Sequence, residues 1–147
     1  MRIKFLFPLL GLFLSCSLYQ DTHDPDIFFE YHDFDILHLG RTISDMFITE
    51  NNQSVFLTDY NNNSIIKIDV NSEMTVSGEI EIGSHPVALD LNSDNSVIVI
   101  ALEGESSIFT VETDQFLIIG EYSIPLMNVN DIVFFNDSIV VISSRTG

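Results

Sequence analysis

Residue types that could do chemistry are unevenly supplied in this chain of 147 residues. It has 22 Asp and Glu, four His and a single Cys, Cys16, against only five Lys and Arg. It contains no Gly-x-Ser-x-Gly elbow, no His-Glu-x-x-His and no glycine-rich phosphate loop, the usual signatures of serine hydrolases, zinc peptidases and nucleotide-binding proteins. The sequence therefore favours a non-catalytic protein without a cofactor, although it leaves enzymatic activity open.

Cys16 lies directly after a segment that has the features of an export signal. Arg2 and Lys4 precede an apolar run of about ten residues, which is too short to span a bilayer. The sequence Phe13-Leu14-Ser15-Cys16 resembles a bacterial lipobox, in which the cysteine is acylated and the chain is cut before it. We expect residues 1–15 to be a lipoprotein signal peptide and Cys16 to be the lipidation site. The alternative is an ordinary secretory signal without lipid.

Residues 16–34 are polar and acidic, and we expect them to form a tether between the anchor and a folded domain. His23 and His32 lie among the carboxylates of this segment, which allows a metal site as a hypothesis. No ligand spacing is matched, and acidic tethers bring such neighbours together by chance, so whether a metal binds is left as unknown.

The charge balance limits the partners that this protein can have. The formal net charge is −17, and a chain without residues 1–15 would carry −19, with three cations against 22 carboxylates. Such a surface repels nucleic acid and anionic lipid, because both need positive charge from the protein. Membrane contact is therefore expected through the lipid anchor only. A basic partner remains open, as does the interpretation that the acidity only maintains solubility.

An internal repeat organises the rest of the chain. Residues 43–59 match residues 85–101 at a spacing of 42, and the spacing slips to 43 where residues 64–69 match residues 107–112. A third copy begins at Asn130 and continues to Ile142. A fixed period of about 40 residues is typical of repeat architectures, in which each unit buries its apolar faces against the next.

Each copy holds four short apolar stretches, which in the first copy are 46–48, 54–58, 65–68 and 76–82. Asn-rich breaks separate them and β-branched residues fill them, while helical periodicity is absent. Four short strands per repeat predict blades of a β-propeller, at about 43–83, 85–125 and 129–147, the last incomplete. Five phenylalanines fall at strand positions and are expected in the core: Phe47, Phe56, Phe109, Phe134 and Phe135.

Over residues 36–147 the sequence resembles the YVTN-type propeller repeats, which are similar to the lactonase-like propellers. The resemblance rests on Phe56-Leu57-Thr58-Asp59, on Ile68-Asp69, and on Gly83-Ser84-His85-Pro86 before an apolar strand. The asparagine that names the family's motif is replaced by Asp59, Ala101 and Ser143 in the three copies. The resemblance implies an all-β propeller and says little about activity.

The repeats are too few for a closed ring. A propeller needs at least about four blades, and this chain has two full copies, an expected preceding strand at Asp35–Leu39, and the first two strands of a third copy. We expect a fragment of a longer reading frame, with self-assembly of short chains as the alternative.

In propellers of this kind, loops between blades and between second and third strands gather at one rim. Here that rim would carry the candidate ligand-binding residues Asp59, Asn61, Asn62, His85, Glu103 and Glu105. We expect a non-catalytic binding or scaffold lipoprotein of the bacterial cell envelope, periplasmic or surface-exposed, whose partner is a protein or a surface glycan. The alternative is a lactonase-like or other hydrolase in which His85 and the rim carboxylates act on a substrate, with turnover only in a complete propeller.

Overall fold

The computed structural model describes residues 36–70, 73–125 and 128–145, and these residues form ten β-strands and no helix. The strands of the first repeat are β1 (Ile43–Ile48), β2 (Ser54–Asp59), β3 (Ser64–Val70) and β4 (Met74–Glu81). Those of the second are β5 (Pro86–Leu91), β6 (Val97–Leu102), β7 (Ser107–Glu112) and β8 (Leu117–Ser123). The third repeat has β9 (Val129–Asn136) and β10 (Ile139–Ser144). No helix in these ranges is long and apolar enough to cross a bilayer.

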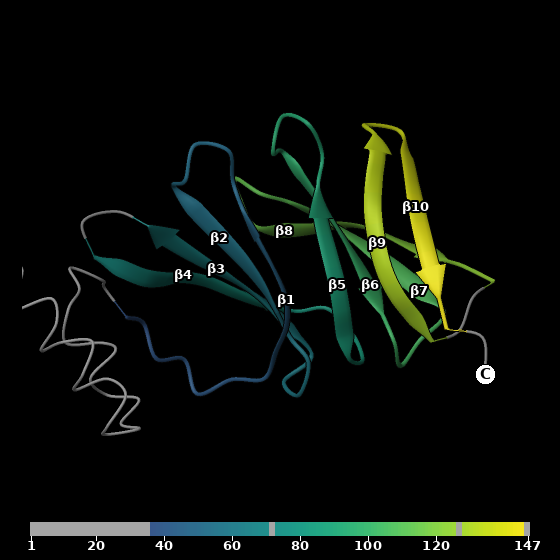
Figure 1. The fold of residues 1–147 in the computed structure, drawn as a ribbon, viewed down its shortest axis with the longest axis horizontal. Helices are drawn as coiled ribbons and strands as arrows, with labels where there is room; N and C mark the ends of the chain where they lie inside the picture. The colour runs from purple at the N-terminus through teal and green to yellow at the C-terminus, as the bar shows by residue number, and fades with distance from the viewer. Residues whose placement is uncertain (1–35, 71–72, 126–127, 146–147) are drawn as a thin grey trace, which may run out of the picture. The chain divides into compact units, whose positions relative to one another are not determined.

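Three separate antiparallel sheets contain these strands, in the orders β1-β2-β3-β4, β5-β6-β7-β8 and β9-β10 (Figure 1). Each sheet is a simple meander, so every strand pairs with its neighbour in sequence. Asparagine closes the hairpins between first and second strands, where Asn52 and Asn95 take positive φ angles of 55° and 60°. Asparagine tolerates this left-handed conformation better than most residues, which explains why Asn marks the breaks in the sequence.

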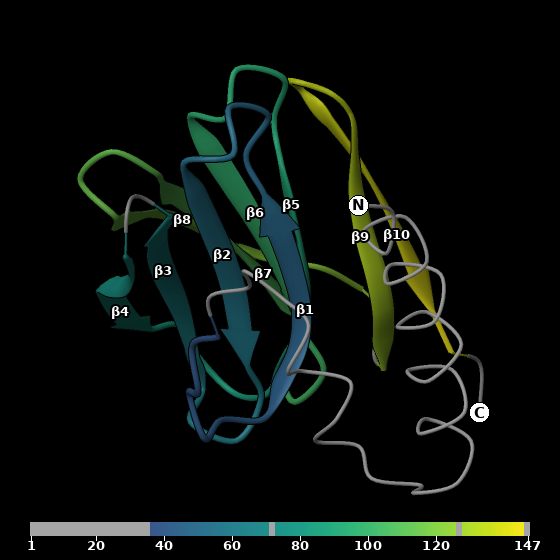
Figure 2. The ribbon, with the colours of Figure 1, turned by 60° about the vertical axis from the view of Figure 1, so that its left-hand side comes forward.

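The sheets follow one another as blades, with their first strands innermost. Strand β5 contacts both β1 and β9, and it lies between them in both views (Figures 1 and 2). The four-stranded sheet β5–β8 is therefore packed on both faces. This arrangement gives two complete blades and the first two strands of a third, so the predicted partial propeller is confirmed.

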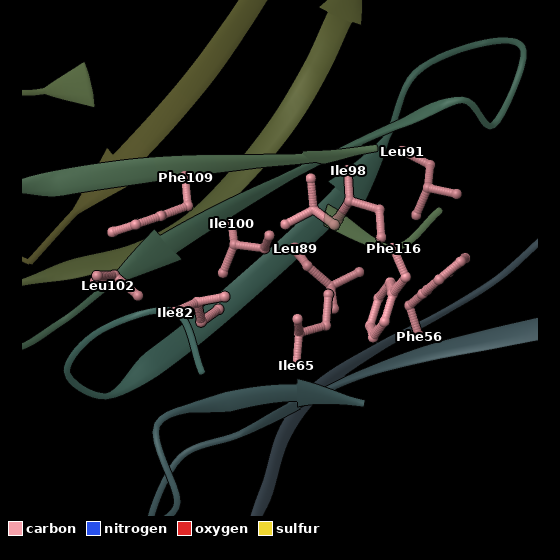
Figure 3. Packing of buried hydrophobic residues seen from close by; sticks show 11 residues of the cluster. Phe56, Ile65, Ile82, Leu89, Leu91, Ile98, Ile100, Leu102, Phe109 and Phe116 are labelled. Atoms are coloured by element: carbon pink, nitrogen blue, oxygen red, sulfur yellow. The ribbon is translucent and has the colours of Figure 1, made fainter. Parts of the chain in front are cut away.

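Two apolar clusters hold the blades together. The first lies between β1–β4 and β5–β8 (Figure 3). It includes Phe56 and Ile65 from the first sheet, Ile82 from the loop after β4, and Ile98 and Ile100 from the second sheet. The second joins the opposite face of β5–β8 to β9–β10. Its buried members are Ala88, Val99, Ala101, Ile108, Val129 and Ile132. Because β6 contributes to both clusters, its sequence Val97–Leu102 is a continuous apolar run without alternation.

The structure corrects the spacing of the repeat. Asp45 pairs with Thr58, and Ala88 pairs with Ala101, so both members of the pair advance by 43 residues and not by 42. The second and third strands also repeat at 43, and the spacing falls to 42 only at the fourth strand. A shift of one residue moves a side chain to the other face of a strand, so the correction changes which residues are equivalent.

One consequence concerns the position that carries asparagine in the YVTN motif. The residues that occupy it in the three sheets are Asp59, Leu102 and Ser144, since these pair with Ile43, Pro86 and Val129 respectively. The predicted equivalents Ala101 and Ser143 were each wrong by one residue. The conclusion that asparagine is replaced in all three copies still holds, because none of the corrected positions is asparagine.

Two further expectations about the strands were wrong. Residues 36–39 do not form a strand, although Leu37 and Leu39 pack against buried residues on the outer face of β2 and β3. Phe135 does not lie in the core either, since it is 73% exposed. It points to the face of β9 that no other sheet of the described residues covers. The other four phenylalanines are buried or partly buried within the two clusters, as expected.

Candidate functional site

The predicted rim residues do gather at one edge of the two complete blades. Strands β2 and β6 end at this edge and β5 begins there; for the first sheet it is the lower edge in Figure 2. The residues that occupy it belong to the loop 60–63, the loop 82–85 between the blades, and the loop 103–106. Hydrogen bonds join these three loops to one another, so the rim is a built surface and not a set of independent turns.

Asp59 forms the most enclosed part of the rim. Its carboxylate is 0% exposed and accepts hydrogen bonds from the Asn62 backbone N–H (3.2 Å) and side-chain amide (2.7 Å). Arg41 completes the shell with an Nη1–Oδ2 ion pair of 3.1 Å. Burial alone would raise the pKa of Asp59, but the bonds from Asn62 and Arg41 outweigh it and lower that pKa below its usual value. Asp59 is therefore held ionised inside the rim.

Arg41 bridges this buried carboxylate to the fourth strand. Its guanidinium also pairs with Glu79 on β4 through two bonds of 3.0 Å, and Ser64 donates to the same Glu79 carboxylate at 3.0 Å. The bond to Glu79 raises the pKa of Arg41, and the bond to Asp59 adds to this. Asp59, Asn62 and Arg41 thus satisfy one another, which makes this part of the rim structural.

A second group links the two blades. Tyr60 donates its hydroxyl to Glu103 Oε2 at 2.8 Å, and its ring lies 4.5 Å from the imidazole of His85, centroid to centroid. The bond to Glu103 raises the pKa of the Tyr60 hydroxyl, and partial burial acts in the same direction. Sequence reasoning placed Tyr60 in this loop but did not single it out. Its role depends on the contact with Glu103, which is 43 residues away in the sequence, and the local sequence pattern does not indicate such a contact.

His85 and Glu105 both contact Ser84, in the loop between the blades. Glu105 Oε1 accepts the Ser84 backbone N–H at 3.0 Å, and Ser84 Oγ lies 2.9 Å from His85 Nδ1. His85 has a φ of 55°, and its own N–H donates to Asn63 Oδ1 at 2.9 Å. Gly104 permits this close approach, because a Cβ there would lie 2.9 Å from His85 Nδ1. A side chain at position 104 would also be too close to Ser84, so these loops would have to shift apart to accept one.

The side chains of the rim are largely held by contacts within the protein. Within the described ranges, no group of three or more His, Cys, Asp or Glu side chains is placed to hold a metal ion. The carboxylates of Asp59, Glu103 and Glu105 each accept a hydrogen bond from the protein itself. Asn61 is also engaged, donating to Thr42 Oγ1 at 2.7 Å. Cys16, His23 and His32, the other candidates from the sequence, lie outside the described residues.

The cations beyond residue 35 make internal contacts, and Arg41 alone is paired with carboxylates among the described residues. Of the three cations beyond residue 35, Arg41 is paired as described, and Arg145 Nε donates to Asn130 Oδ1 at 2.9 Å. Lys67 Nζ donates to the Thr113 carbonyl at 3.0 Å and lies 5.9 Å from the centre of the Phe56 ring. The exposed charge of the described residues is therefore mainly negative.

Two hollows lie away from the rim. One, of about 450 Å³, is largely apolar and lies between β6–β8 and the hairpin β9–β10, with Val99, Ile108, Phe134 and Val140 in its walls. In the complete blades, third and fourth strands extend each sheet beyond its second strand. The third sheet ends at β10 in the described residues, which leaves this space beside it. The other, about 260 Å³, is polar and includes Lys67 and Asp94.

Comparison with known proteins identifies the architecture. No protein-family model matches the sequence, and neither does any curated protein. Among solved structures, the chain is similar to the periplasmic gluconolactonase of Pseudomonas aeruginosa, with a TM-score of 0.63 and 11% identity over 71% of this chain and 33% of that one. A putative 6-phosphogluconolactonase from Bacteroides uniformis gives 0.62 and 14%, over 72% and 34%.

A third similar structure is the β-propeller domain of Cps50 (Swd1) from Myceliophteria thermophila, with a TM-score of 0.60 and 7% identity over 69% of this chain and 36% of that one. At these identities the likeness shows the fold alone, which is the β-propeller. The chain spans about a third of the length of the solved structures it matches. Their different names illustrate that this fold serves more than one function.

Proposed function

We propose that this protein is a lipid-anchored, non-catalytic β-propeller of the bacterial cell envelope, built from YVTN-type repeats, that binds a basic protein partner through the rim described above. The observation that carries the proposal is the state of the rim carboxylates. Glu103 and Glu105 are positioned by Tyr60 and by the Ser84 N–H, each through one oxygen. A carboxylate has about four lone-pair sites, so capacity remains for an external donor.

Charge supports the same partner. The described cations make internal contacts, and the net charge of the chain is −17, so a basic surface would be attracted over a long range. The rim is also held rigid by the Asp59 and Tyr60 contacts, which reduces the entropy lost on binding. A surface glycan would find the same carboxylates as acceptors, but it would not respond to salt as a basic protein does.

The test measures binding of an octalysine peptide to the full chain by fluorescence anisotropy at low and physiological salt. The double variant Glu103→Gln/Glu105→Gln should weaken binding at low salt by about tenfold, as expected for two lost charge contacts of about 0.7 kcal/mol each. A matched control, Glu73→Gln/Asp114→Asn, removes the same charge from exposed turns at the opposite edge. If both double variants lost affinity for the peptide equally, binding would depend only on the net charge of the protein, and the rim proposal would fail.

The anchor is tested separately. Expression of the full chain in a bacterium supplied with an alkyne-bearing fatty acid should label the protein, and Cys16→Ser should remove the label. Ser17→Ala, at the neighbouring position, should leave it unchanged. Labelling that persists in Cys16→Ser would contradict acylation at this residue, whatever the outcome for the rim.

A lactonase activity is the second candidate, because two of the similar structures carry lactonase names. His85 is exposed at the rim beside Ser84 and Glu105, and it is the residue that could move a proton there. Hydrolysis of gluconolactone and 6-phosphogluconolactone above the spontaneous rate would support this candidate if His85→Ala abolished it and His38→Ala did not. Rates at the spontaneous level throughout would mean that this chain by itself does not hydrolyse these two lactones.

A further inference from the structure

The polar hollow of about 260 Å³ lies between the two complete blades, at the edge opposite the rim. Its walls come from the β1–β2 hairpin and β3 of the first blade and from the β5–β6 and β7–β8 turns of the second. The β1–β2 and β5–β6 hairpins lie at the upper edge of their sheets in Figure 2. Both blades have all four strands, so no missing strand opens this hollow.

The first blade places a cation in the hollow. Lys67 is half-buried on β3, where it pairs with Phe56 of the first cluster. Its ammonium donates to the Thr113 carbonyl, and no carboxylate of the described residues forms an ion pair with it. A partly buried charge without a counter-charge costs free energy, and an ammonium has three donors. An anionic group in the hollow would therefore be stabilised by Lys67.

The repeat itself does not require a lysine at this place. Thr110 is the equivalent residue in the second blade, since it pairs with Val99 where Lys67 pairs with Phe56. Lys67 is also one of only three cations beyond residue 35, in a chain with 22 carboxylates. The lysine is therefore a property of this hollow and not of the blade architecture.

The second blade places negative charge in the same hollow, through Asp94 and Asp114. Asp94 Oδ1 accepts the Ser96 backbone N–H at 3.0 Å, and hydrogen bonding to Ser96 holds the pKa of Asp94 below its usual value. The Asp94 carboxylate is therefore ionised at neutral pH, and it keeps acceptor capacity beyond the bond from Ser96. One wall thus carries a donor-only cation and the other carries acceptor-only anions.

From this separation of charge we infer that the hollow is a binding site for a free amino acid, whose carboxylate contacts Lys67 and whose ammonium contacts Asp94. A zwitterion satisfies both walls at once, whereas a simple anion would face the carboxylates and a simple cation would face the lysine. The site lies at the edge opposite the rim, so it is independent of the rim's proposed partner.

Hydrogen bonds hold both walls in place. In the first blade, Asn51 Oδ1 accepts the Thr49 hydroxyl at 2.7 Å, and Asn51 Nδ2 donates to Gln53 Oε1 at 3.3 Å, which leaves the Gln53 amide N–H groups for the ligand carboxylate. In the second blade, Thr113 Oγ1 donates to the Asn95 carbonyl at 2.8 Å. Such a site loses little entropy on binding.

The size of the hollow limits the ligand. Pockets for drug-sized molecules measure about 300–1,000 Å³, and this hollow of about 260 Å³ lies just below that range. A single amino acid fits these dimensions, whereas an oligosaccharide or a folded peptide does not.

The experiment is isothermal titration calorimetry of the full chain, in a mild detergent, with each of the twenty free amino acids in turn. At least one should bind, and acetate and ethylammonium, which carry one charged group each, should bind at least about tenfold more weakly. Amide signals of Gln53, Asn95 and Thr113 should shift in the nuclear magnetic resonance spectrum during the same titration, which locates the ligand.

Lys67→Met and Asp94→Asn should each weaken binding of that amino acid by about tenfold or more, because each removes one charged contact. The matched controls are Arg145→Gln, which removes a cation near the third sheet, and Glu121→Gln, which removes an exposed carboxylate on β8. Both controls should leave the affinity unchanged. Asp94 is exposed, so Asp94→Asn keeps the test decisive if circular dichroism shows that Lys67→Met does not fold.

Four results would overturn the inference. They are no binding by any amino acid up to about 10 mM, binding of acetate or ethylammonium as tight as that of the best amino acid, binding of glucose as tight as that of the best amino acid, and unchanged affinity in folded Lys67→Met or Asp94→Asn. The rim variant Glu103→Gln/Glu105→Gln should bind the amino acid normally, so failure of the rim proposal and failure of this one are distinguishable.

Discussion

Replacing Asp59 by Asn removes one negative charge from the enclosed part of the rim while keeping the shape of the side chain. The asparagine oxygen can still accept the Asn62 backbone N–H, but the ion pair with Arg41 at 3.1 Å is lost. Breaking a fully buried pair costs about 3–5 kcal/mol, and a hydrogen bond to a charged group contributes about 1.5–3 kcal/mol. Arg41 is 30% exposed and keeps Glu79, so the lower range applies and we expect a loss of about 2 kcal/mol.

The assay is urea unfolding of the full chain at pH 7, followed by circular dichroism, with Asp114→Asn as the control. Asp114 is exposed, and its side chain makes no hydrogen bond among the described residues, so its substitution should change the free energy of unfolding by less than about 0.5 kcal/mol. Equal free energies of unfolding for the two variants would refute the claim that the Asp59 carboxylate stabilises the rim.

The pH dependence gives a second check on the same residue. Because the pKa of Asp59 is lowered in the folded protein, its charged form contributes stability above the unfolded-state pKa of about 3.9. That contribution is lost as the pH falls through the lower folded-state pKa. The difference between the unchanged chain and Asp59→Asn should therefore be constant from about pH 5 to 7 and close below about pH 4. A difference that grows on acidification would contradict the sign of the shift.

Two further predictions use pairs of positions within the chain. Ser64→Ala should destabilise the fold by about 1 kcal/mol, because Ser64 donates to Glu79. Ser107→Ala, at the equivalent position of the next blade, should be neutral or stabilising, because Ser107 Oγ is buried without a partner among the described residues. A larger loss of stability for Ser107→Ala than for Ser64→Ala in urea unfolding would contradict this. Ile100→Ala should lower the free energy of unfolding by about 2–5 kcal/mol, because Ile100 is 0% exposed in the first cluster. Ile119→Ala, at a residue 56% exposed, should lower it by less than about 1 kcal/mol. Similar losses for the two variants in thermal unfolding would argue against this core.

The strands could be predicted from the sequence because local signals mark them. Asn-rich breaks take the left-handed turn conformation, as at Asn52 and Asn95, and β-branched residues fill the segments between them. The register could not be predicted with the same success. Residues 97–102 are apolar throughout because both faces of their sheet are buried, so alternation gives no indication of which side chain points to which neighbour.

The membership of the rim was predictable, but its internal contacts were not. Topology alone brings the loops after β2, β4 and β6 to one edge, which is why Asp59, His85 and Glu103 meet there. Asp59 is fully enclosed because Arg41 contacts both Asp59 and Glu79. The pairing of β3 with β4 places Glu79 within reach of Arg41. No local pattern in the sequence indicates it.

The central claim is that the sheet β5–β8 is packed between two others, one on each face. Labelling the isoleucine δ1 methyl groups and measuring nuclear Overhauser effects between them tests this directly. We expect Ile100 to give effects with Ile65 and Ile82, which share the first cluster, and Ile108 to give effects with Ile132, which shares the second. Effects that join Ile65 or Ile82 to Ile132, with none to Ile100, would show a two-layer sandwich and contradict the stack of blades.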